Sequence, residues 1–203
     1  MDRSGNKIVL IGDSGVGKSS LVYWFMYGKS TPMICPTIGA AFCTKEIIYQ
    51  GNKVKFNIWD TAGQERFRSL VKMYYKGTCG CVCVFDITNK SSFLSLDYWI
   101  NDYAEHCTDE NNKIIIVANK CDHDKSKWCV DEEEIKKIAN KYNCDYVLTS
   151  CINGQGVNQV FYKLADLILI TTPDPPKIVI EKSNNEIIDL TIKYSPLRLI
   201  PWC

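Results

Sequence analysis

The sequence lacks an excess of charge of either sign. Its 24 Lys and Arg residues face 23 Asp and Glu residues, which leaves a formal net charge of +1. Proteins that bind nucleic acid usually carry a clustered surplus of basic residues, and this balance gives no sign of one. We therefore expect no nucleic-acid partner.

The sequence also lacks an uninterrupted apolar run of transmembrane length, and residues 1–5 contain no apolar stretch that could serve as a secretory signal. Asp2 stands where N-myristoylation requires Gly. We therefore expect a cytosolic start without N-myristoylation.

The 11 cysteines are odd in number and lack the Cys-x-x-Cys spacing of a metal site or redox motif. We interpret them as reduced thiols. Cys79, Cys81 and Cys83 alternate along an apolar run, which predicts that their side chains share one face of a strand. Core packing is favoured over metal binding for this group.

A chain of 203 residues fits one ordinary domain and a short appendage. Short apolar runs alternate with helical patterns, which is typical of strand-helix-strand units that build a parallel sheet. Strands are predicted at Lys7–Ile11, Phe42–Tyr49, Val54–Trp59, Cys81–Asp86, Lys113–Ala118 and Asp145–Thr149, and helices at Lys18–Met26, Ser92–Cys107, Asp131–Asn143 and Val157–Ile170.

The residues Gln50-Gly51-Asn52 between the second and third strands predict a hairpin, and therefore one antiparallel edge strand. The expected fold is α/β in three layers: a six-stranded, mainly parallel sheet with helices on both faces. Pro173-Asp174-Pro175-Pro176 cannot continue a helix. We therefore expect a domain over residues 5–171 and a tail over residues 172–203. For the tail, a mobile state is favoured over a hairpin around Asn184-Asn185.

The strongest motif follows the first predicted strand and opens the first predicted helix, as a P-loop requires. Glycines allow backbone N–H groups to turn toward phosphate oxygens, and the helix N-terminus adds positive potential. Lys18 is expected to reach the outer phosphates, and the Ser19 hydroxyl to bind Mg²⁺. The motif consists of Gly12, Asp13, Ser14, Gly15, Val16, Gly17, Lys18 and Ser19.

Phosphate binding alone leaves ATPases, nucleotide kinases and GTPases open. Asn119-Lys120-Cys121-Asp122 follows an apolar strand, at the end where ligands of open parallel sheets bind. A carboxylate at Asp122 can accept hydrogen bonds from the ring N–H and the amine of guanine, whereas adenine offers no matching pair of donors. This motif therefore favours GTP over ATP, with Asn119, Lys120 and Asp122 as base-reading residues.

A third motif, Asp60-Thr61-Ala62-Gly63-Gln64, ends another predicted strand. Asp60 is suited to hold Mg²⁺ through water, and the backbone N–H of Gly63 can contact a terminal phosphate. Gln64 can orient a water molecule for in-line attack, which makes it the predicted catalytic residue. Without an arginine from a second protein, hydrolysis is expected to be slow.

These motifs, in this order and spacing, resemble the small GTPases of the Ras superfamily, and the Rab branch most closely. The stretch from Trp59 to Phe67 is Rab-like, as is Met73-Tyr74-Tyr75-Lys76-Gly77, while Thr37 to Phe42 is similar to the early-endosomal Rab subgroup. The resemblance covers residues 5–171. It implies a GTP hydrolase that binds GTP or GDP with Mg²⁺.

By this resemblance, Thr37 binds Mg²⁺ and contacts the terminal phosphate, and residues 60–75 form a second switch. The resemblance also implies a monomeric chain whose partners are effectors, an exchange factor and a GTPase-activating protein. Two roles stay equally open for Trp59. It either belongs to an exposed aromatic group with Phe42 and Tyr74, or packs as a partly buried strand residue. The implied effector region consists of Ile34, Cys35, Pro36, Thr37, Ile38, Gly39, Ala40, Ala41 and Phe42.

Two departures from the family concern the guanine pocket. The family has an aromatic residue over the base at the position of Ser30, so we expect weaker affinity or faster release of nucleotide, at a cost of about 1 kcal/mol. Where the family has Ser-Ala-Lys, this chain has Ser150, Cys151 and Ile152. The base contact made by a backbone N–H there is still available from Cys151, whereas Ile152 cannot replace the lysine.

The chain ends in a single cysteine, Cys203, whereas most Rab proteins end in two nearby cysteines that carry geranylgeranyl groups. The charges of residues 172–203 cancel, so no polybasic second anchor is present. One prenyl group on Cys203 is preferred over a free cysteine. The main functional prediction is a Rab-like switch in vesicle traffic, and the alternative is a GTP-binding decoy that sequesters Rab partners with little hydrolysis.

Overall fold

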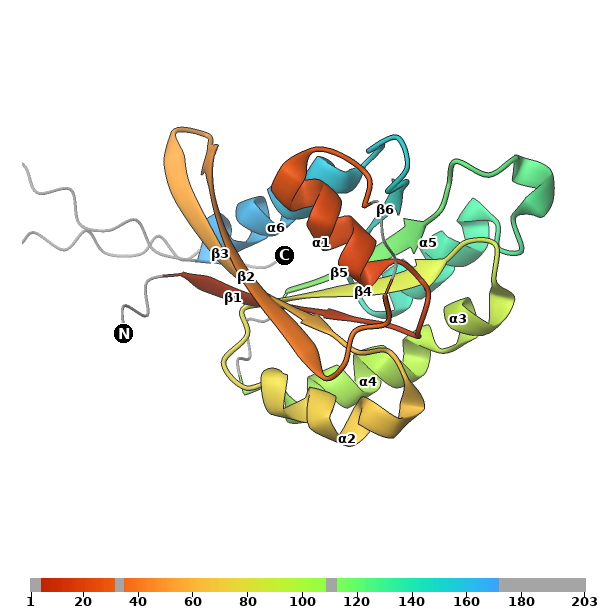
Figure 1. Cartoon of the computed structure of the whole chain (residues 1–203), viewed down its shortest axis with the longest axis horizontal. Coiled ribbons are helices and arrows are strands. Elements are labelled where there is room, and N and C mark those ends of the chain that lie inside the picture. The colour runs from red at the N-terminus through yellow and green to blue at the C-terminus, as the bar shows by residue number, and fades with distance from the viewer. Residues whose placement is uncertain (1–4, 32–34, 109–112, 172–203) are drawn as a thin grey trace, which may run out of the picture. The chain divides into compact units, whose positions relative to one another are not determined.

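A six-stranded sheet forms the middle layer of the protein, in the spatial order β2-β3-β1-β4-β5-β6 (Figure 1). The structure is a computed structural model, and it describes residues 5–31, 35–108 and 113–171. β2 pairs antiparallel with β3, and all other neighbouring strands pair in parallel, as predicted. The strands are β1 (Asn6–Ile11), β2 (Ala40–Tyr49), β3 (Asn52–Thr61), β4 (Gly80–Asp86), β5 (Lys113–Asn119) and β6 (Asp145–Thr149).

Helices cover both faces of this sheet, with α1 and α6 on one face and α2, α3, α4 and α5 on the other (Figure 1). They are α1 (Lys18–Tyr27), α2 (Arg68–Val71), α3 (Lys90–Leu94), α4 (Leu96–His106), α5 (Glu132–Lys141) and α6 (Val157–Thr171), with 3₁₀ turns at Glu65–Phe67, Lys72–Tyr74 and Lys125–Lys127. Within the described ranges, no helix is both long and apolar enough to cross a bilayer.

Strand alternation divides the core into two clusters, one on each face of the sheet. On β1, Ile8 and Leu10 point into the cluster under α1 and α6, whereas Val9 and Ile11 point into the cluster that contains Trp99 of α4. All four β1 side chains are fully buried. A strand covered on both faces needs apolar residues at every position, and this explains the continuous apolar run in the sequence.

The predicted hairpin is confirmed. Tyr49 pairs with Asn52 across a two-residue turn in which Gln50 and Gly51 have φ values of 49° and 78°. Two positive φ angles are the mark of the type I′ turn that matches the twist of antiparallel strands. The predicted acidic start of α5 is also present: Asp131 and Glu134 form a reciprocal capping box between their side chains and backbone N–H groups.

The single helix predicted at Ser92–Cys107 is wrong, because the structure has α3 and α4 separated at Ser95. Asn89 caps α3 by accepting hydrogen bonds from the N–H groups of Ser91 and Ser92, so the helix also begins two residues earlier. The Ser95 hydroxyl donates to the Ser91 carbonyl at 3.1 Å. Serines that bond to nearby backbone groups weaken a continuous helix, although Ser95 keeps helical dihedral angles and its backbone hydrogen bonds to Ser91 and Trp99.

One further expectation needs correction, and one feature was not predicted. Cys79 lies before β4 and packs against the cluster under α1 and α6, whereas Cys81 and Cys83 are buried in the opposite cluster. The three side chains therefore do not share one face, because alternation holds only within the strand. The short helical pieces between Glu65 and Tyr74 were not predicted, since segments of three or four residues carry no readable period.

Candidate nucleotide site

The predicted P-loop joins the end of β1 to the start of α1, at the sheet edge where the parallel strands end. Gly12 and Gly17 have φ values of 134° and 102°. A Cβ atom at Gly12 would lie 2.1 Å from the Val84 carbonyl oxygen, and one at Gly17 would lie 2.2 Å from Nδ2 of Asn119. Both positions therefore require glycine for conformation and for space.

Lys18 lies under this loop and is only 5% exposed. Its Nζ donates to the backbone carbonyls of Gly12 at 2.7 Å and Asp13 at 2.8 Å. Burial lowers the pKa of Lys18 to about 8, and the nearby carboxylates of Asp60 and Asp13 oppose this effect. A buried ammonium group inside a loop of backbone N–H groups forms a binding site for anions such as phosphate.

Three side-chain oxygens from separate elements meet beside the loop. Ser19 Oγ donates to Asp60 Oδ2 at 2.6 Å and lies 2.8 Å from Thr37 Oγ1, which is 3.4 Å from the same Asp60 oxygen. Asp60 is 5% exposed, and burial raises its pKa, while the Ser19 hydrogen bond and the Lys18 charge lower it. The second carboxylate oxygen, Oδ1, is buried and accepts no hydrogen bond from any described residue.

The chemistry of this cluster fits a divalent cation. Hydroxyl and carboxylate oxygens are the ligands that Mg²⁺ prefers, and a metal ion or its bound water would satisfy the buried Asp60 oxygen. Ser19, Thr37 and Asp60 come from α1, from the segment before β2 and from β3. The predicted ligands therefore lie together, although they are up to 41 residues apart in the sequence.

The segment after β3 packs directly on the P-loop. A Cβ atom at Gly63 would lie 2.4 Å from the backbone of Gly12 and Asp13, so the Gly63 peptide is held close to the phosphate loop. Gln64 lines the same pocket, but its Oε1 accepts a hydrogen bond from Arg66 Nε at 2.7 Å. The predicted catalytic side chain is thus present at the pocket and is paired with a neighbour there.

Asn119 connects three loops at the carboxyl end of β5. Its Nδ2 donates to the Val16 carbonyl at 2.8 Å, and its Oδ1 accepts from Thr149 Oγ1 at 2.9 Å and from Cys151 Sγ at 3.4 Å. The side chain is 2% exposed. These bonds join the P-loop, the β5 end and the β6 end, which is a structural role that motif reading did not identify.

Lys120 and Asp122 follow Asn119 and line the pocket. Lys120 has a φ of 67°, and its Nζ lies 2.6 Å from Asp86 Oδ2 at the end of β4. Burial of Asp86 would raise its pKa, but hydrogen bonds from Lys120 and Thr88 outweigh this effect and hold it below the ordinary value. Asp86 was missed by motif reading, although an acidic residue that ends a buried strand is a usable signal.

The predicted Ser150 and Cys151 begin the loop after β6. The Ser150 hydroxyl is buried and accepts from the N–H groups of Ile152 at 3.2 Å and Asn153 at 3.4 Å. Burial raises the pKa of the Cys151 thiol to about 12, so this thiol stays protonated at neutral pH. The loop is therefore held by internal hydrogen bonds beside the base-reading residues.

These elements enclose a pocket of about 830 Å³, which is within the usual range for ligand sites. The loop from Asn119 and the loop from Cys151 form one end, and Ser19, Thr37 and Gln64 form the other. Among the described residues its lining comprises Ser14, Gly15, Gly17, Lys18, Ser19, Ser20, Tyr23, Thr31, Cys35, Pro36, Thr37, Thr61, Gly63, Gln64, Asn119, Lys120, Asp122, His123, Cys151 and Ile152.

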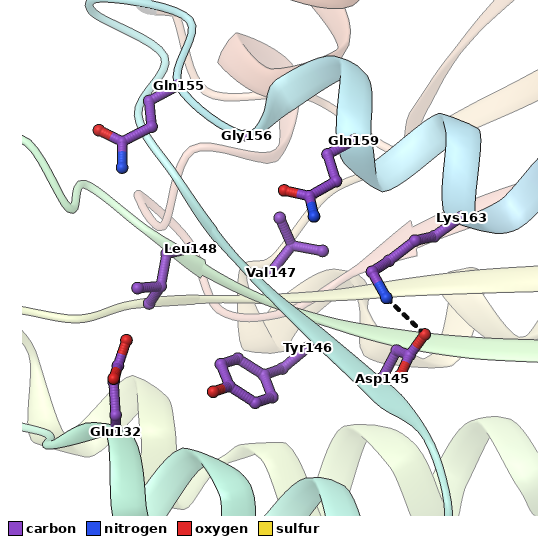
Figure 2. Close-up of a pocket in the computed structure, with 9 residues that line it drawn as sticks. All are labelled: Glu132, Asp145, Tyr146, Val147, Leu148, Gln155, Gly156, Gln159 and Lys163. Atoms are coloured by element: carbon purple, nitrogen blue, oxygen red, sulfur yellow. Dashed lines mark hydrogen bonds and ion pairs between the residues drawn. The ribbon is translucent and has the colours of Figure 1, made fainter.

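A second hollow of about 480 Å³ lies beside the edge strand β6 (Figure 2). Figure 2 shows residues of α5, β6 and α6 around it, with an ion pair of 2.7 Å between Lys163 and Asp145. Among the described residues that line it, none belongs to the predicted site. The predicted chemistry therefore lies in the larger pocket.

The implied effector region runs from the pocket to the start of β2, except for Ile34, which lies outside the described residues. Ile38 is 82% exposed and Phe42 is 55% exposed. The rings of Phe42, Trp59 and Tyr74 form a row, with centroid distances of 5.0 Å and 4.9 Å. Trp59 and Tyr74 are half-buried and pack against the core, so the packing reading of Trp59 holds, and Phe42 is the exposed ring of the three.

A glycine-rich loop with a buried lysine, between the first strand of a parallel sheet and the following helix, defines a P-loop nucleotide-binding protein. The sequence profile of the Ras family matches residues 7–170, and the chain therefore belongs to the Ras family.

Its relatives carry Rab names. The chain is 46% identical over 196 residues to a "Probable Rab-related GTPase" of Acanthamoeba polyphaga mimivirus, with 96% of this chain and 88% of the relative covered. It is 42% identical to "Ras-related protein Rab-8B" of Dictyostelium discoideum, with 84% of each chain covered. It is 41% identical to "Ras-related protein Rab-22A" of Homo sapiens, with 84% of this chain and 87% of the relative covered.

These findings confirm the family prediction: the chain is a Rab-type small GTPase. Members of this family bind GTP and GDP and hydrolyse GTP, so the predicted nucleotide and the predicted enzyme class are also confirmed. The relatives named Rab-8B and Rab-22A match at similar identity, so the early-endosomal subgroup stays a prediction. The decoy alternative gains no support.

Proposed function

We propose that this chain is a slow GTP-hydrolysing switch in membrane traffic, and that the pocket holds GTP or GDP together with Mg²⁺. The observation that carries the proposal is the convergence of Ser19 Oγ, Thr37 Oγ1 and Asp60 Oδ2, which lie 2.6–3.4 Å apart, while the other Asp60 oxygen is buried and accepts no hydrogen bond from a described residue. Bound Mg²⁺ would neutralise charge on the outer phosphates.

In this proposal the P-loop, from Gly12 to Ser19, binds the phosphates through its backbone N–H groups. Lys18 supplies a positive charge to the outer phosphates, and the Gly63 N–H donates to the terminal phosphate. Asp122 accepts hydrogen bonds from guanine, the Cys151 N–H donates to it, and Asn119, Lys120 and Ser150 hold these groups in place.

Hydrolysis requires Gln64 to leave Arg66 and to orient water in line with the terminal phosphate. The Arg66 hydrogen bond competes with this orientation, so hydrolysis without a partner is slow. A GTPase-activating protein that places an arginine in the pocket would supply the missing charge. The test is single-turnover GTP hydrolysis with and without a Rab-activating domain, beside a Gln64→Leu control. Equal rates in all reactions would contradict the proposal.

Nucleotide state is proposed to act through the segment from Cys35 to Phe42 and the segment from Asp60 to Tyr75. Thr37 connects the first segment to the terminal phosphate and its metal ion, so hydrolysis releases it. The row of Phe42, Trp59 and Tyr74 then forms part of the effector surface. The test compares effector capture by the GTP-loaded and the GDP-loaded chain. Equal capture in both states would contradict this reading.

We further infer that the GTPase domain spans residues 5–171 and that residues 172–203 form the tail. A single prenyl group on Cys203 would let the chain cycle between the cytosol and the cytoplasmic face of membranes. Residues 172–203, and Cys203 with them, lie outside the described residues. An intact mass equal to that of the unmodified chain after expression in eukaryotic cells would contradict lipidation.

A further inference from the structure

The carboxylate of Asp13 does not line the nucleotide pocket among the described residues, although its backbone belongs to the P-loop. The Asp13 carbonyl accepts a hydrogen bond of 2.8 Å from Lys18 Nζ. The side chain makes a different contact: Oδ1 accepts a hydrogen bond of 2.9 Å from Nε1 of Trp99 on α4. Trp99 is buried in the core cluster on the α4 face of the sheet. Asp13 therefore connects the P-loop to that face.

Arg68, the first residue of α2, lies against the same carboxylate oxygen. Its Nη2 is 3.9 Å from Asp13 Oδ1. Its Cζ is 4.5 Å from the ring centroid of Tyr98 and 5.4 Å from that of Trp99, and these two rings lie edge to face with their centroids 5.4 Å apart. α2 and α4 cover the same face of the sheet (Figure 1). The guanidinium group is therefore held between a carboxylate and an aromatic pair.

These contacts are weak enough to be broken when the nucleotide changes. The Arg68 side chain is 37% exposed, so solvent screens its ion pair with Asp13. Its Nε is buried and donates no hydrogen bond to any described residue. Stacking on the rings of Tyr98 and Trp99 is then the main contact that holds Arg68. A segment that must move between two states needs an attachment of this modest strength.

Gln64 lies between two attachments to the same P-loop residue. At one end, a Cβ atom at Gly63 would lie 2.4 Å from the carbonyl carbon of Asp13, so the two backbones are in direct contact. At the other end, Arg68 lies against the Asp13 carboxylate. Between them, Gln64 Oε1 accepts a hydrogen bond from Arg66 Nε. The segment 63–68 is therefore fastened to Asp13 at both ends, and this limits how far Gln64 can move.

We propose that Asp13, Arg68, Tyr98 and Trp99 form a latch that holds the segment 63–68 against the P-loop, with Arg68 as a positioning residue for Gln64. This inference rests on the proposed function and concerns the control of its hydrolysis step. With the latch closed, Gln64 stays near the terminal phosphate and orients the attacking water more often. With the latch open, the segment moves away while the P-loop keeps the nucleotide.

The first experiment measures single-turnover GTP hydrolysis and release of labelled GDP, both with the full chain and Mg²⁺. Arg68→Met keeps an apolar stem and removes the charge. It should slow hydrolysis by about 3- to 10-fold and change GDP release by less than about twofold, because Arg68 does not line the pocket. Arg68→Lys should recover only part of the rate, since an ammonium group keeps the charge but lacks the planar stacking.

Asp97→Asn is the matched control for loss of a paired carboxylate. Asp97 lies on α4 as Trp99 does, and it pairs with Lys141 at 2.8 Å. It belongs neither to the latch nor to the pocket lining. Hydrolysis by this variant should therefore stay within about twofold of wild type. Equal slowing by Asp97→Asn and Arg68→Met would overturn the latch.

The second experiment is a double-mutant cycle on the hydrolysis rate. Asp13→Asn keeps an oxygen that accepts from Trp99 but removes the charge that attracts Arg68. Asp13→Asn and Arg68→Met should each slow hydrolysis, and the double variant should be no slower than the slower single variant, because both open one latch. Tyr98→Ala should slow hydrolysis by a smaller factor. Strictly additive effects of the Asp13 and Arg68 variants would overturn the latch.

The third experiment measures the latch without catalysis, by hydrogen exchange of the chain loaded with a GTP analogue that resists hydrolysis. Arg68→Met should raise exchange in residues 63–71 and leave thermal stability unchanged. Unchanged exchange in these residues would overturn the latch, as would equal fold-changes in hydrolysis and GDP release, which indicate general damage to the pocket. A wild-type chain that binds nucleotide but does not hydrolyse GTP would overturn the proposed function instead, so the two failures are distinguishable.

Discussion

Replacement of Asn119 by Ala should destabilise the protein even without nucleotide. The side chain is 2% exposed and bonds to Val16, Thr149 and Cys151. The substitution leaves the Val16 carbonyl and the buried Thr149 hydroxyl without these partners. Each buried polar group that loses its partner costs about 1–3 kcal/mol, so the free energy of unfolding should fall by about 2–6 kcal/mol.

That loss is large compared with the stability of an ordinary domain, which is about 5–15 kcal/mol. Urea unfolding of nucleotide-free protein measures it directly, and repetition with excess GDP adds the contribution of binding. Asn140→Ala is the matched control, because Asn140 lies exposed on α5, and it should stay within about 0.5 kcal/mol of wild type.

A second variant separates hydrogen bonding from loss of volume. Thr149→Val removes the hydroxyl that Asn119→Ala leaves without its partner, so the double variant should be less destabilised than the sum of the two single variants. If nucleotide-free Asn119→Ala unfolds within 1 kcal/mol of wild type, the proposed connection of three loops through Asn119 is wrong.

Four other predictions concern the pocket. Gln64→Leu should slow single-turnover GTP hydrolysis by about 10- to 100-fold without weakening GDP binding. Ser30→Phe should slow GDP release by up to about 10-fold, and no slowing would count against the expected loss at this position. Chelation of Mg²⁺ by EDTA should accelerate GDP release in the wild type and have a smaller effect in Ser19→Ala, which has already lost a ligand. Because the pKa of Asp86 is held below 3.8 in the folded chain, its contribution to stability is present above that pH and is lost as the pH falls through the lower folded value. Acid unfolding curves of Asp86→Asn should therefore be less steep below about pH 4 than those of the wild type, and identical curves would refute the assignment.

Local patterns were sufficient to predict most of the sheet. Apolar runs of four or five residues stand at β1, β4 and β5 because these strands are covered on both faces, and the turn at Gln50-Gly51 set the hairpin register. The break at Ser95 was not predicted, since the hydrophobic spacing continues across it and Ser95 itself keeps helical dihedral angles and its backbone hydrogen bonds to Ser91 and Trp99.

The predicted site residues came from three motifs, and each motif was readable because its chemistry is local. A P-loop needs glycines at fixed spacing, and a base-reading carboxylate needs only to follow a strand. Asp86 belongs to no such motif. Its place at the site depends on its ion pair with Lys120, which lies 34 residues further along the chain.

The sequence by itself determined the P-loop, the guanine motif and the Rab-type identity, because glycine conformations and hydrogen-bonding groups are properties of individual residues. Only the tertiary structure decided that the side-chain oxygens of Ser19, Thr37 and Asp60 lie within 3.4 Å of one another and that Asn119 joins three loops. Such contacts arise when the parallel strands end at one edge of the sheet, and no sequence spacing encodes that distance.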